Sequence, residues 1–111
     1  MKEDRIYLLH IRDSAERIFK YTAAGKEVFL AETMIQDAVV RNLEIIGEAV
    51  KRISEKTRNS HPDVPWKQIA GMRDKMIHEY FGVDLELIWR VVEKDLRQFA
   101  GTVQTILQAA E

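Results

Sequence analysis

Apolar residues recur along this chain at intervals of three and four positions, which is the spacing of one face of an α-helix. Four runs show this spacing, with charged residues between the apolar ones: residues 7 to about 22, about 31 to 57, 66 to about 80, and 84 to about 109. Their apolar positions are, in order, Leu8, Ile11, Ala15 and Ile18; Ile35, Ala38, Val39, Ile46, Ala49, Val50 and Ile53; Trp66, Ile69, Ala70, Ile77 and Tyr80; and Leu85, Ile88, Val92, Leu96, Phe99, Val103 and Ile106. The pattern predicts four amphipathic helices.

The segments between the runs contain residues that end or begin helices. Gly25 ends the first predicted helix. Residues 27–33 have no clear pattern, and we expect Phe29 and Leu30 there to pack against the core. Residues 59–65 contain both prolines of the chain and predict a loop, from which Pro65 opens the third helix.

The fourth run has a clear start. Gly82 ends the third predicted helix, and Asp84 is a typical N-cap for the fourth. Four helices joined by short links bury their apolar faces most simply as an antiparallel bundle. We therefore predict a single all-α domain over residues 1–111, a four-helix bundle with room for a short extra helix or turn.

The amino-acid composition limits which kinds of functional site the chain can form. The chain has no cysteine, and its three histidines are scattered, so a zinc site or another resident cofactor is not expected. Its 17 basic and 18 acidic residues leave a net charge of −1, so any contact with RNA must use a local basic patch. No run approaches the roughly 20 apolar residues that cross a membrane, and we expect a cytoplasmic protein.

Chemically versatile side chains gather in residues 72–82. At about 100° per residue, Asp74 and His78 lie one above the other on a helix, so the carboxylate can orient the imidazole. Arg73 and His78 are five positions apart, roughly 140° around the helix. The two side chains can act on the same substrate atom in three ways. The helix can be distorted, the long arginine side chain can reach around it, or a second copy of the segment can lie across a two-fold axis. We favour the two-fold axis, and hence a homodimer.

The spacing of Arg73, His78 and Tyr80 resembles the signature of the HEPN ribonucleases, and most closely that of the HepT toxins. The resemblance extends to residues 36–49, which are similar to the second helix of that family, and to residues 66–74 and 83–89 on either side of the motif. It covers most of the chain and is therefore more specific than the motif spacing alone.

The resemblance implies a function and a role for Tyr80, and the side-chain chemistry of the other motif residues suggests theirs. The function is that of an endoribonuclease toxin whose partner is a minimal nucleotidyltransferase antitoxin. His78 would move protons, Arg73 would hold the phosphate, and Asp74 would orient His78. Tyr80 would accept AMP from the antitoxin. RNA supplies its own nucleophile, the 2′-hydroxyl, so no metal is required. Whether tRNA or mRNA is cut is left open.

Four basic residues, Lys51, Arg52, Lys56 and Arg58, lie close together at the end of the second predicted helix. They have two interpretations: complementing the helix dipole, or tracking RNA phosphates toward the motif, where Lys75 would add a further cation. Asn42, in the middle of the apolar stripe, predicts a hydrogen bond to another helix in preference to a contact with substrate. Gly71 can either leave space over His78 or allow close helix packing.

Two functions remain to be separated. One is the ribonuclease toxin. The alternative is a helical binding or scaffold partner of a nucleotidyltransferase, without activity of its own. Spacing alone favours a structural role for a single helical histidine, whereas the intact motif and the wider resemblance favour the enzyme. Arg73 and His78 exposed in a shared groove would indicate catalysis.

Overall fold

The structure is a computed structural model, which describes residues 2–72, 74 and 84–109. The described residues form helices and contain no strand, so the predicted all-α class is confirmed. In chain order the elements are α1 (Lys2–Tyr21), α2 (Lys26–Ala31), α3 (Thr33–Lys51), α4 (Glu55–Ser60), α5 (Trp66–Ala70), α7 (Leu85–Arg90), the π-helical turn η1 (Val91–Asp95) and α8 (Leu96–Ala109).

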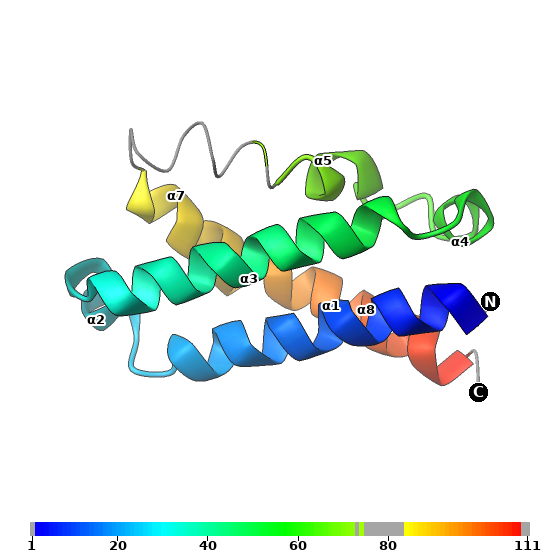
Figure 1. The fold of residues 1–111 in the computed structure, drawn as a ribbon. Coiled ribbons are helices and arrows are strands. Elements are labelled where there is room, and N and C mark those ends of the chain that lie inside the picture. The colour runs from blue at the N-terminus through cyan, green and yellow to red at the C-terminus, as the bar shows by residue number, and fades with distance from the viewer. Residues whose placement is uncertain (1, 73, 75–83, 110–111) are drawn as a thin grey trace.

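The long helices run antiparallel, as predicted. Figure 1 shows α3 returning along α1, and α8 running back to the end of the molecule where α1 begins. The predicted face of α1, with Leu8, Ile11 and Ile18, is fully buried, and Val39 and Ile46 of α3 are buried in the same core. Burying these faces supplies the main driving force for the fold.

The second predicted helix is wrong at both ends. It was expected over residues 31–57, but α3 begins at Thr33 and ends at Lys51. Glu32 is extended and separates α3 from α2. Ser54 is also extended and starts α4 by accepting a hydrogen bond from the Thr57 N–H, while Arg58 donates to the carbonyls of Val50 and Ile53 at the end of α3. Side-chain capping therefore divides one amphipathic pattern into two helices.

Asp4 explains why α1 begins at Lys2, earlier than the predicted Tyr7. Its side chain is only 4% exposed. One carboxylate oxygen accepts from the Ser54 N–H at 3.0 Å, and the other accepts from the hydroxyls of Ser54 and Thr57, each at 2.6 Å. The first turn of α1 is thereby joined to the junction between α3 and α4.

The same bonds determine the charge state of Asp4. Burial by itself would raise its pKa, but the hydrogen bonds from Ser54 and Thr57 and the positive amino terminus outweigh burial, so the pKa lies below its ordinary value of 3.8. The carboxylate is therefore ionised at neutral pH.

The segment from 26 to 33, which had no clear pattern, contains the short helix α2. Phe29 is fully buried and Leu30 is partly buried, as expected. Gln36 donates to the carbonyls of both residues and so ties α2 to α3. Gly25 has φ of 100°, a conformation that suits glycine, at the turn between α1 and α2.

The fourth predicted helix is confirmed, with one irregularity. The Asp84 side chain accepts a hydrogen bond from the Leu87 N–H at 3.0 Å, which is the predicted N-cap. Helical structure then continues to Ala109, and the residues of the predicted stripe from Ile88 to Ile106 are buried. The π-helical turn Val91–Asp95 lies within it, and such turns often mark functional sites.

Among the described residues, Asn42 lacks the hydrogen bond to another helix that the sequence predicted. Its amide nitrogen donates to the Ala38 carbonyl of the same helix at 2.8 Å. Its amide oxygen is buried and has no hydrogen-bond partner in the part of the chain that the structure describes.

Candidate functional site

The chemically versatile stretch, residues 72–82, follows α5. The third predicted helix begins at Trp66 as expected, but α5 ends at Ala70 and Gly71 lies in a turn. Met72 and Asp74 are again helical. Asp74 is exposed to solvent. Arg73, Lys75, His78 and Tyr80 lie outside the described residues, as do Ile77 and Gly82. The pairing of Asp74 with His78 therefore stays a prediction.

Contacts with the bundle hold the residues that precede this stretch. Trp66, the first residue of α5, is buried, and its indole N–H donates to the His61 carbonyl at 2.9 Å. Its ring meets Phe99 of α8 edge to face, with centroids 5.8 Å apart. Ile69, one turn later, is also buried. These contacts hold α5 against the bundle.

The chain after the stretch is fixed as well. Asp84 caps α7, and Ile88 is buried in the core. Trp89 packs against Phe29 with centroids 5.5 Å apart, and Glu86 forms an ion pair with Lys26 of α2 at 2.7 Å. In sequence, the motif is therefore flanked on both sides by helices that pack in the bundle.

The four predicted basic residues do not form one free patch. Arg58 caps α3, with its guanidinium bonded to two carbonyls, which supports the dipole interpretation for this residue. Lys51 lies 3.5 Å from Glu48. Arg52 and Lys56 are exposed. Figure 1 shows that α4 and the end of α3 lie at the opposite end of the bundle from α7, so these cations lie nearer to α5 than to α7.

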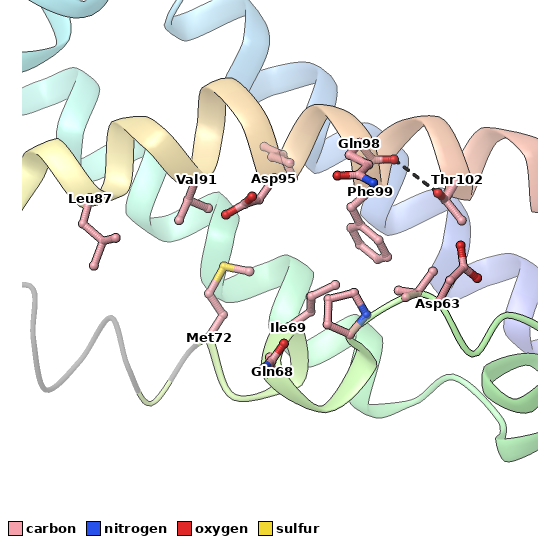
Figure 2. Close-up of a pocket in the computed structure, with 13 residues that line it drawn as sticks. Asp63, Gln68, Ile69, Met72, Leu87, Val91, Asp95, Gln98, Phe99 and Thr102 are labelled. Atoms are coloured by element: carbon pink, nitrogen blue, oxygen red, sulfur yellow. Dashed lines mark hydrogen bonds between the residues drawn. The ribbon is translucent and has the colours of Figure 1, made fainter.

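A groove lies beside the start of the motif. It runs between α5 with its preceding loop and the continuous helix α7–η1–α8, with a cavity of about 370 Å³, and is referred to below as the α5–α8 groove. Figure 2 shows Ile69 and Met72 on one wall, and Leu87, Val91, Asp95 and Phe99 along the other. The groove was not predicted from the sequence. The sequence holds one weak sign of the π turn that lines it. The buried residues Ile88, Val92 and Leu96 follow one another at intervals of four positions, without the usual interval of three between them.

Two further properties of the described residues concern metal-binding groups and membrane-spanning helices. Within the described ranges, no group of three or more histidine, aspartate or glutamate side chains is placed to hold a metal ion. None of the helices among those residues is long and apolar enough to cross a membrane.

An all-α domain that carries the spacing Arg73, His78, Tyr80 between two anchored helix ends has the features of the HEPN class. The chain belongs to the family described as Ribonuclease HepT-like, which matches residues 11–106. The match includes the whole motif and all elements from α2 to η1.

Named relatives agree with this assignment. A protein of Caldanaerobacter subterraneus subsp. tengcongensis, named as a candidate RNase, is 45% identical over 109 residues that cover 97% of both chains. A protein of Thermococcus cleftensis, named probable ribonuclease HepT, is 42% identical over 90% of this chain and 92% of its own. In Methanocaldococcus jannaschii, a protein named as a gamma-glutamylcyclotransferase and candidate RNase is 44% identical over 96% of this chain but only 49% of its own length. No solved structure gives a significant match.

Proposed function

We propose that this chain is an endoribonuclease that cuts RNA without a metal ion. The observation that carries the proposal is membership of the HepT-like ribonuclease family over residues 11–106, because the matched range contains Arg73, His78 and Tyr80 with their spacing intact. The packing of α5 and α7 supports it, because the motif lies in sequence between two helices that are held in the bundle.

The reaction needs few protein groups. The 2′-oxygen of a ribose attacks the adjacent phosphorus, so an O2′–P bond forms as the P–O5′ bond breaks. A base takes the 2′-hydroxyl proton, and an acid gives a proton to the departing 5′-oxygen, which leaves a 2′,3′-cyclic phosphate and a 5′-hydroxyl. His78 suits the proton transfers because imidazole titrates near neutral pH. Arg73 suits the charge on the phosphorane because a guanidinium stays cationic and binds phosphate oxygens in pairs.

The site is proposed to form across a homodimer. Arg73 and His78 point roughly 140° apart on one regular helix, so a single copy does not easily aim both at one phosphate. Two copies related by a two-fold axis would place two arginines and two histidines along one groove. One histidine could then act as base while the other acts as acid. The exposed position of Asp74 is compatible with orienting His78 at such a surface.

Metal independence gives a direct test. We expect the purified full-length protein to cut total RNA equally well with and without excess EDTA, because the proposed groups are all side chains. A metal-dependent nuclease in a parallel reaction shows that chelation is complete. Loss of cleavage on chelation, restored by added Mg²⁺ or Mn²⁺, would contradict the mechanism.

We also propose that the protein is the toxin of a toxin–antitoxin pair, neutralised by a minimal nucleotidyltransferase that transfers AMP to the Tyr80 hydroxyl. In this step the tyrosine oxygen forms a bond to the α-phosphorus of ATP and pyrophosphate leaves. The added nucleotide would place negative charge and bulk next to Arg73 and His78 and so compete with the RNA phosphate.

Intact mass spectrometry can test the modification. After incubation with the nucleotidyltransferase and ATP, we expect the wild-type chain to gain whole AMP units and Tyr80→Phe to gain none. Tyr21→Phe is the matched control, because Tyr21 is an exposed tyrosine on α1, away from the motif in sequence, and should still allow the gain. Equal modification of Tyr80→Phe and wild type would exclude Tyr80 as the acceptor.

A further inference from the structure

The α5–α8 groove is elongated and mainly apolar. It follows one helical rod from Leu87 to Thr102, a length of about 22 Å at 1.5 Å per residue. Ile69 and Phe99 lie on its two opposite walls, and Met72 and Leu87 line one end (Figure 2). A cavity of about 370 Å³ holds a few large side chains, not a whole helix. The shape suits a rod-like segment that lies along the groove and inserts anchoring side chains.

The charged residues of the groove indicate what kind of segment it can bind. Asp95 extends from η1 on one wall, and Asp63 lies in the loop before α5 on the other, towards Thr102 (Figure 2). Both are exposed, and neither has an ion-pair partner among the residues that the structure describes. The described lining contains no lysine, arginine or histidine. An RNA backbone would be repelled by these two carboxylates, whereas a segment carrying lysine or arginine would be attracted.

We propose that the α5–α8 groove is a docking site for an amphipathic helical segment of a partner protein, with apolar residues on one face and basic residues beside them. The apolar side chains enter the cavity between Ile69 and Phe99. The basic side chains pair with Asp63 and Asp95. This proposal does not depend on ribonuclease activity, because it rests only on the shape, apolar surface and charge of the groove.

The groove is lined by residues that flank the motif in sequence. Met72, at its end, directly precedes Arg73 in sequence, and Leu87 lies three residues after the capping residue Asp84. A bound segment therefore contacts the chain on both sides of the motif. A partner held there touches residues that flank the motif in sequence.

The test uses the full-length protein and two synthetic helical peptides of the same length, one built from leucine and lysine and the other from leucine and glutamate. Binding is followed by two-dimensional NMR of the ¹⁵N-labelled protein. We expect the leucine–lysine peptide to shift the amide signals of Gln68, Met72, Val91 and Thr102, and the leucine–glutamate peptide to leave them unchanged. The double variant Asp63→Lys/Asp95→Lys should bind the leucine–lysine peptide at least about tenfold more weakly, because two attractions become repulsions.

The control variant is Glu16→Lys/Glu27→Lys, which changes the net charge by the same amount at exposed positions of α1 and α2 outside the groove lining. It should bind the leucine–lysine peptide nearly as tightly as the wild type. Equal weakening of both double variants, or shifts that map away from the groove, would overturn the proposal. So would shifts of the groove signals with single-stranded RNA, or with rising protein concentration alone, since these indicate RNA or a second copy as the occupant.

Discussion

His78→Ala is expected to lower the rate of RNA cleavage by at least about 100-fold, the usual contribution of a positioned acid or base. Arg73→Ala should cause a loss of similar size, because it removes the cation that stabilises the charged transition state. Cleavage rates of a labelled RNA, measured with equal amounts of folded protein, provide the comparison.

His61→Ala is the matched control for the histidine. His61 lies in the loop before α5 and holds Trp66 through its backbone carbonyl, which alanine retains. We expect this variant to cut RNA at nearly the wild-type rate. Full activity in His78→Ala would remove the histidine from the mechanism, and equal loss in both histidine variants would indicate a general effect on the fold.

Asp4→Ala should cause the largest loss of stability among changes to polar side chains. It removes the hydrogen bond from the buried Thr57 hydroxyl and the two hydrogen bonds from Ser54. Losing hydrogen bonds to a buried charged group should lower the free energy of unfolding by about 2–3 kcal/mol. Urea unfolding followed by circular dichroism measures this difference. Glu3→Ala, which removes the same charge from an exposed neighbour in the first turn, should have a much smaller effect.

The effect of Asp4 should depend on pH. Its folded pKa lies below the ordinary value of 3.8, so the unfolded chain takes up the proton first as the pH falls. The stabilisation is complete above the unfolded pKa and is lost as the pH falls from about 3.8 through the folded pKa. The stability difference between wild type and Asp4→Ala should therefore be largest at neutral pH and should shrink in acid. A difference that grows in acid would contradict the ionised, hydrogen-bonded carboxylate.

Periodicity predicted the helices because burial follows local spacing. The buried faces of α1 and α8 match the predicted positions, and the Asp84 cap was visible as a single residue before an apolar run. The break between α3 and α4 was not predictable in this way. It depends on Arg58 reaching back to Val50 and on Asp4 bonding Ser54, fifty positions away in sequence. Capping by distant side chains leaves no periodic signal.

One part of the candidate site could also be predicted from the sequence, and another part could not. The motif could be recognised from sequence because Arg73, His78 and Tyr80 lie within eight consecutive residues. The α5–α8 groove could not, because it forms only when residues 63–72 pack beside residues 87–102. The basic residues at the end of α3 show the limit of charge patterns, since Arg58 serves the backbone and Lys51 lies beside Glu48.

Analysis of fragment ends tests the central claim most directly. Total RNA is incubated with the full-length protein in EDTA, and the new 3′ and 5′ ends are identified chemically. Fragments ending in 2′,3′-cyclic phosphate with 5′-hydroxyl partners, absent with His78→Ala, are the predicted result. Fragments with 3′-hydroxyl and 5′-phosphate ends, or intact RNA with the wild-type protein, would contradict it.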